Sequence, residues 1–98
     1  MLLHTINKSP FSHSALSECL RLCSDDATIV LIEDGVYAAL ADTEWIVRIA
    51  ARCNKIYALA PDIAARGLHD RIAAIVNIID YDGFVELCCT HTTIQSWY

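Results

Sequence analysis

Five cysteines are the residues of this 98-residue sequence whose side chains could do covalent chemistry. A thiolate is both a nucleophile and a metal ligand, so its surroundings decide which role it takes. The set is odd in number, has no disulfide-framework spacing and contains no C-x-x-C pair, which argues against a disulfide scaffold and against a thioredoxin-like dithiol. We expect these thiols to be reduced. They are Cys19, Cys23, Cys53, Cys88 and Cys89.

Cys19 is the thiol whose position is most compatible with reactivity. It falls early in an expected helix that follows the first expected strand, where the helix dipole lowers a thiol pKa modestly. A cysteine on an apolar helix stripe is also a common small core residue, and the spacing alone favours that interpretation. We expect structural roles for Cys23, Cys53 and the Cys88-Cys89 pair.

Metal and nucleotide sites are not predicted. Cys88-x-x-His91 is a single half-site, and the other histidines, His4, His13 and His69, are scattered along the chain. The three glycines form neither a G-x-G-x-x-G turn nor a phosphate-binding loop, so no cofactor is expected.

Short polar segments follow the expected strands: residues 7–9, 33–35, 61–62 and 80–83. Open parallel sheets bind ligands beyond the carboxyl ends of their strands, which is where these segments would lie. Asp, Asn, Ser and Gly are also the residues that turns and helix caps require. The turn and capping interpretation is the favoured one.

Four apolar runs predict the strands that position these residues: 2–6, 28–32, 55–60 and 75–79. Strands without polar alternation are buried on both faces. Stretches with helical spacing separate them, which predicts an α/β fold: a mostly parallel sheet flanked by helices on both faces. We expect one domain over residues 1–98, without linker or repeat.

The expected helices differ in the signals that define them. The first begins near Ser12 or Ser14 and buries Leu16, Cys19, Leu20 and Cys23. The second spans residues 44–52, with Thr43 as its cap and an ion pair between Glu44 and Arg48. A brief third helix covers residues 62–66, between Pro61 and Gly67. The last follows Asp80 and repeats Tyr81, Phe84, Val85 and Cys88, after which residues 90–98 form a polar tail.

Composition excludes some partners and favours others. Hydrophobic residues make up 55% of the chain and charged residues 19%, an apolar excess that predicts burial against a partner protein. A net charge of −5 disfavours direct nucleic-acid binding. No secretory signal is apparent, and no apolar run approaches the roughly 20 residues of a membrane span, so we expect a soluble, cytoplasmic protein without membrane contact.

The order and spacing of several segments extend over nearly the whole chain. These are residues 4–11 (HTINKSPF), 31–40 (LIEDGVYAAL), 57–59 with Asp62 and 65–67, 79–81 with Phe84, Val85 and Leu87, and 95–97. In this order they resemble the TusB/DsrH family of bacterial sulfur-relay subunits. The resemblance implies the Rossmann-like fold of DsrE/F/H-type subunits.

The resemblance to this family also implies that the chain is part of a protein complex. Members of this family join TusC/DsrF-type and TusD/DsrE-type subunits in a heterohexamer with two copies of each. Such complexes pass persulfide sulfur between sulfur-carrier proteins. The sulfur ends in the 2-thiouridine of tRNA wobble positions in the Tus branch and serves intracellular sulfur oxidation in the Dsr branch. The principal acceptor cysteine belongs to the TusD/DsrE-type subunit.

Two functional hypotheses therefore stand. Cys19 matches a position where DsrH-type members carry a cysteine and some TusB-type members do not, which makes it a candidate persulfide carrier. Alternatively, the chain is a non-catalytic subunit that positions the acceptor on its partner. Exposure of Cys19 distinguishes the two, because a persulfide carrier needs access as well as thiolate character.

Overall fold

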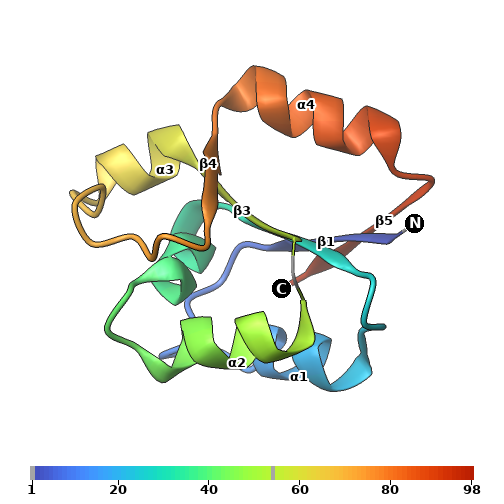
Figure 1. The fold of residues 1–98 in the computed structure, drawn as a ribbon, viewed down its shortest axis with the longest axis horizontal. Helices are drawn as coiled ribbons and strands as arrows, with labels where there is room; N and C mark the ends of the chain where they lie inside the picture. Colours follow the sequence, from blue (N-terminus) through green and yellow to red (C-terminus); the bar gives the residue numbers. More distant parts are fainter. Residues whose placement is uncertain (1, 54) are drawn as a thin grey trace.

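A computed structural model describes residues 2–53 and 55–98 and shows a sheet with a helix after nearly every strand (Figure 1). The elements are β1 (Leu2–Ile6), α1 (Ala15–Leu22), β2 (Thr28–Leu31), the 3-10 helix η1 (Glu33–Ala39), α2 (Glu44–Arg52), β3 (Lys55–Leu59), α3 (Ala60–Ala65), β4 (Asn77–Ile79), α4 (Tyr81–Thr90) and β5 (Thr93–Trp97). The strand order is β4-β3-β2-β1-β5, and every pairing is parallel. The α/β prediction is confirmed.

Burial is greatest in the two strands at the middle of the sheet. All four residues of β2 are buried, and so are the last four of β1. Such strands have neighbours on both edges and layers on both faces, which explains their unbroken apolar runs. The registers Leu3↔Thr28 and Ile6↔Leu31 align these two strands along their length.

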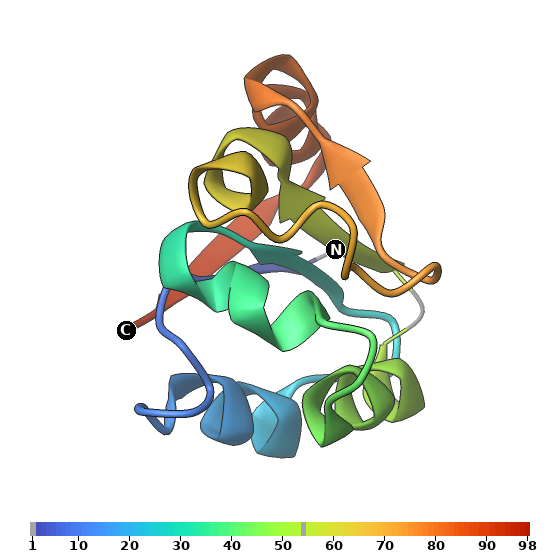
Figure 2. The ribbon, with the colours of Figure 1, turned by 90° about the vertical axis from the view of Figure 1, so that its left-hand side faces the viewer.

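Helices cover the two faces unequally. Figures 1 and 2 show α1 and α2 side by side beneath the sheet and α4 on the opposite side. Leu16 and Ile49 belong to the main hydrophobic cluster, which fills the space between α1, α2 and the sheet. No residue of α4 is buried: Phe84 and Cys88 are half-buried, whereas Tyr81 and Val85 are exposed. The expected stripe of α4 is therefore only partly covered.

The expectation that residues 90–98 form a polar tail is wrong. Residues 93–97 form β5, which lies beside β1 from Leu2↔Thr93 to Ile6↔Trp97. As an edge strand, β5 is exposed at four of its five residues, so the sequence lacks the apolar run by which buried strands are detected. Its backbone nevertheless completes the hydrogen bonding of β1.

Three further expectations at the sheet margin needed correction. The fourth strand begins at Asn77 rather than at residue 75, and Asn77 and Ile78 are exposed because β4 is the other edge of the sheet. The segment after β2 forms η1, where the sequence predicts a turn. The third helix begins at Ala60 and ends at Ala65, earlier than residues 62–66.

Helix ends follow the sequence signals in part. Ser14 and Thr43 occupy the N-caps of α1 and α2, but neither side chain accepts a capping hydrogen bond; Thr43 Oγ1 instead donates to the Leu40 carbonyl. Asp80 caps α4, accepting from Gly83 N at 2.8 Å. Gly67 leaves α3 with φ 66°, the left-handed exit expected of glycine.

Candidate functional site

The C-terminal ends of α1 and α2 bring three of the five thiols together. Cys23 and Cys53 are the C-cap residues of these helices, and their Sγ atoms lie 4.0 Å apart. Cys19 is near enough to both for their charges to influence its titration. All three are buried and reduced. Their spacing in the sequence does not predict this cluster, because they meet only where the two helices pack together.

Burial dominates the chemistry of Cys19. Its side chain is 0% exposed, and burial, followed by the neighbouring Cys23 and Cys53, raises its pKa to about 12. The expected position of Cys19 early in its helix is wrong: α1 begins at Ala15, so Cys19 is its fifth residue and lies beyond the first turn, where the helix dipole would lower a thiol pKa. At neutral pH the thiol is protonated and inaccessible, and these are the properties of a core cysteine.

The other thiols differ mainly in access. Burial, followed by the influence of Cys23, raises the pKa of Cys53 to about 12, although the adjacent Arg52 acts in the opposite sense. Burial also raises the pKa of Cys88, which is half-buried near the end of α4. Cys89 is the exposed cysteine of the chain.

The polar residues beyond the carboxyl ends of β2 and β3 bind one another. Asp62 Oδ2 accepts from Glu33 N at 2.7 Å, and Arg66 donates from Nε and Nη2 to Asp34 Oδ1 at 3.0 and 2.8 Å. These bonds tie η1 to α3. Glu33 needs this support because its φ is 50°, a left-handed conformation that costs about 1–3 kcal/mol in a residue other than glycine. The capping interpretation is confirmed for Asp80. Neither η1 nor α3 has a side-chain cap of its own, so Asp34 and Asp62 serve to join the two elements.

Two histidines are held inside hydrogen-bonded pairs. Trp97 Nε1 donates to His4 Nδ1 at 2.9 Å, joining the last strand to the first. His91 lies between the Leu87 carbonyl, 2.7 Å from Nδ1, and Thr28 Oγ1, 3.1 Å from Nε2. These partners agree with structural roles for both rings. Residues 2–53 and 55–98 contain no group of three or more His, Cys, Asp or Glu side chains placed to hold a metal ion.

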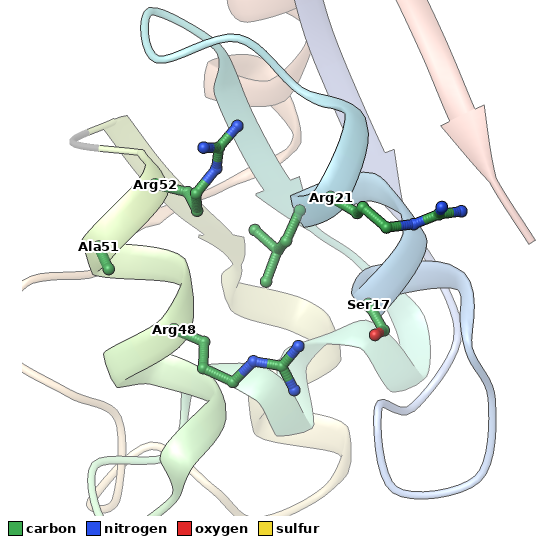
Figure 3. Close-up of a pocket in the computed structure, with 6 residues that line it drawn as sticks. Ser17, Arg21, Arg48, Ala51 and Arg52 are labelled. Atoms are coloured by element: carbon green, nitrogen blue, oxygen red, sulfur yellow. The ribbon is translucent and has the colours of Figure 1, made fainter.

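A surface groove lies between α1 and α2. Its volume is about 400 Å3, and Figure 3 shows arginines on both sides of it. Its lining residues are Ser17, Leu20, Arg21, Arg48, Ala51 and Arg52. The pattern of residues along the chain does not predict this site. The i,i+4 spacing of Arg48 and Arg52 on one helix was the available signal, but Arg21 joins them only in the folded chain.

Membrane crossing is not supported by any helix in the described ranges, since none has the necessary length and apolar character.

Comparisons with known proteins bear on the whole chain. A family model described as "DsrH like protein" matches residues 8–94. The chain is 40% identical to Protein TusB of Pectobacterium parmentieri and 36% identical to Protein TusB of Enterobacter sp. (strain 638), in each case over 98% of this chain and all of the relative. It is 35% identical, with the same coverage, to Protein TusB of Escherichia coli O81 (strain ED1a).

A solved structure has the same fold. The crystal structure of the ychN protein from E. coli superposes with a TM-score of 0.81 and covers 97% of both chains, at 17% sequence identity. That similarity concerns architecture only. The family match and the identities to curated relatives over nearly the full length carry the assignment, so the chain belongs to the TusB/DsrH family.

Proposed function

We propose that the chain is a subunit of a cytoplasmic sulfur-relay complex that passes persulfide sulfur between carrier proteins. The observation that carries this proposal is the family match over residues 8–94, together with relatives aligned over their whole length. The relay would serve either 2-thiolation of tRNA wobble uridine or intracellular sulfur oxidation. Genes for a dissimilatory sulfite reductase beside this one would favour sulfur oxidation.

The partners we propose are TusC/DsrF-type and TusD/DsrE-type subunits, assembled as a heterohexamer. Single exposed apolar side chains are common on protein surfaces, but this small chain has many of them. Their number supports association with other proteins. The large exposed hydrophobics are Phe11, Leu22, Val47, Ile75, Ile78, Tyr81, Val85, Ile94 and Tyr98. Burying such a set against partners would stabilise the complex through the hydrophobic effect.

Within the complex, positioning of the acceptor subunit is the role that the geometry of Cys19 favours. Sulfur transfer to Cys19 would require its thiolate to attack the sulfane sulfur of a donor persulfide, forming one S–S bond while the donor thiolate leaves. A buried thiol with a pKa of about 12 offers neither the thiolate nor a path for the donor. A relay role for Cys19 therefore requires that assembly open the site.

Mass spectrometry of the loaded complex tests the proposal. The assembled complex is incubated with a persulfide donor, and each subunit is examined for a gain of one sulfur atom. We expect the gain on the TusD/DsrE-type subunit and none on this chain, with transfer unchanged in Cys19→Ala. Sulfur on this chain that Cys19→Ala abolishes would establish the carrier role instead.

Two controls make the result interpretable. Cys19→Ser is compared with Cys19→Ala, because a serine hydroxyl at a buried position lacks an assured partner and costs about 1–3 kcal/mol. Cys89→Ser removes an exposed thiol and reports sulfur added non-specifically. If the chain fails to assemble with either partner type and no transfer depends on it, the relay proposal itself is wrong.

A further inference from the structure

We infer that the groove between α1 and α2 is a docking site for a short acidic peptide segment of a partner protein, held by Arg21 and Arg48. The groove has cations on both sides and apolar side chains between them. This arrangement suits a segment with carboxylates flanking an apolar residue. The inference is independent of sulfur chemistry, because no thiol lines the groove.

The concentration of positive charge is the first argument. The chain has seven Lys and Arg against twelve Asp and Glu, yet the groove gathers Arg21, Arg48 and Arg52. Arg21 comes from α1, whereas Arg48 and Arg52 lie one turn apart on α2. An acidic protein that places three arginines around one depression creates a local attraction for anions that its overall charge opposes.

The second argument is that two of these arginines have no carboxylate of their own. Among residues 2–53 and 55–98, the ion pairs involve Arg52 and Arg66 but neither Arg21 nor Arg48. The expected pair between Glu44 and Arg48 does not form. Instead, the Arg48 guanidinium lies over the Trp45 ring, 4.4 Å from its centroid. This contact holds the cation in place without neutralising it.

Arg52 has a different part in the groove. Its Nη2 donates to the Cys23 carbonyl, and its Nη1 lies 3.8 Å from Asp25 Oδ1. These bonds join α2 to the chain after α1 and partly satisfy the charge, so Arg52 shapes one end of the groove. Figure 3 shows Arg48 reaching from α2 toward α1, while Arg21 projects from α1. Arg21 extends away from α2 in Figure 3, and as an exposed side chain without an ion pair in the described ranges it is free to turn toward a ligand in the groove.

The shape and surroundings of the groove favour a peptide over a longer polyanion. Leu20 and Ala51 give it apolar lining, which stabilises an aliphatic side chain but not a phosphate backbone. Exposed acidic residues, Glu18 and Glu44, lie in the first turns of the two helices, and Asp25 lies beside Arg52. A nucleic acid extending beyond the groove would meet these carboxylates. A short segment ends before reaching them.

Fluorescence anisotropy with the full-length chain tests this site. The probe is a fluorescein-labelled Glu-Glu-Leu-Glu-Glu peptide, and the matched peptide Gln-Gln-Leu-Gln-Gln reports charge-independent binding. We expect binding of the acidic peptide that weakens at least about fivefold between 50 and 300 mM salt, since exposed ion pairs are screened. Arginine stays charged throughout the accessible pH range, so the affinity for the peptide should be constant from about pH 6 to 9. It should fall below about pH 4, where the glutamates of the peptide become protonated.

Charge-matched variants locate the binding. Arg21→Gln and Arg48→Gln should each weaken it about two- to fivefold, and the double variant about tenfold or more. Lys55→Gln combined with Arg71→Gln removes the same charge elsewhere and should leave the affinity within about twofold. Both arginines are exposed, so thermal melts should match wild type for Arg21→Gln and fall slightly for Arg48→Gln, which loses a cation–π contact with Trp45.

Several outcomes would overturn the inference. One is an absence of salt-sensitive binding of the acidic peptide. Another is an equal loss of peptide affinity in the two double variants. A third is competition by low-millimolar inorganic phosphate, which would show that the groove binds small anions. Preferential binding of a 12-nucleotide single-stranded RNA would assign the groove to nucleic acid. A change of oligomeric state in the Arg21→Gln/Arg48→Gln variant without peptide would make it an interface between copies of this chain.

Discussion

At the scale of single residues, solvent access determines the chemistry of the cysteines more than helix position does. Cys19 lies beyond the first turn of its short helix, where the dipole acts little, and desolvation raises the pKa of this fully buried thiol. Its neighbours Cys23 and Cys53 raise the pKa further. A nucleophile would need an open approach, which the fully buried Cys19 lacks.

The first prediction follows from this ranking of access. Treating the native chain with iodoacetamide at pH 8 should modify Cys89 first and Cys88 more slowly, because Cys88 is half-buried and its pKa is raised. Cys19, Cys23 and Cys53 should remain unmodified until denaturant is added. Peptide mass spectrometry over a time course measures each site. Early labelling of Cys19 would mean that the α1–α2 region opens readily in solution.

At the scale of elements, one glycine fixes how η1 leaves the sheet. A Cβ atom on Gly35 would lie 2.1 Å from the Ile6 carbonyl oxygen at the end of β1. Both groups are backbone, so neither can move aside without displacing an element. This close approach explains why a glycine follows Asp34, and it links the exit of β2 to the exit of β1.

The second prediction compares two glycine substitutions. Gly35→Ala should lower the free energy of unfolding by about 3 kcal/mol or more, since backbone must shift to admit the methyl group. Gly67→Ala should cost only about 1–2 kcal/mol, because its φ of 66° is strained for alanine but the space around it is open. Urea denaturation of both variants gives the two values. Equal losses would contradict the steric account.

The third prediction concerns the attachment of β5. Burial lowers the pKa of His4 below its ordinary value of about 6.5, and the ring accepts from Trp97 only while Nδ1 is unprotonated. The unfolded chain therefore binds more protons at this group than the folded one does. Stability should be complete above about pH 6.5 and should decrease as the pH falls toward the lowered pKa.

Two measurements check the sign of this effect. Urea denaturation between pH 7.5 and 5 should show a smaller pH dependence in His4→Leu than in wild type, because the two proteins differ only at this group. NMR titration of the His4 ring in the wild-type chain gives its pKa directly. A value above 6.5 would reverse the expected dependence.

The elements that could be predicted are those whose buried side chains recur at regular intervals in the sequence. Leu16, Cys19 and Leu20 point into the core from α1, and their spacing predicted that helix. The edge strand β5 could not be found this way, because one side of it has no neighbour and its residues stay exposed. The cysteine cluster and the arginine groove depend on the packing of α1 against α2, which no local pattern encodes.

At the scale of the whole molecule, the two faces of the sheet differ in how well they are covered. The face under α1 and α2 holds the main hydrophobic cluster, with Leu16, Ile49 and Ile29 fully buried. On the opposite side α4 buries none of its residues, and Tyr81, Val85 and the β5 residue Ile94 remain exposed. An asymmetric α/β layer of this kind gains stability when another protein covers its open side.

The fourth prediction is that the isolated chain is not a stable monomer. Its exposed apolar side chains should drive self-association, and co-expression with TusC/DsrF-type and TusD/DsrE-type subunits should give a mixed oligomer in its place. Hydrophobic association does not weaken with salt, so the oligomers should persist in 1 M NaCl, whereas peptide binding at the arginine groove should not. Sedimentation velocity at low and high salt measures the size of the oligomers formed by the chain alone and with its partner subunits. A single 10.9 kDa species that ignores the partner subunits would contradict the prediction, and salt-induced dissociation would indicate that charged surfaces rather than apolar ones make the contacts.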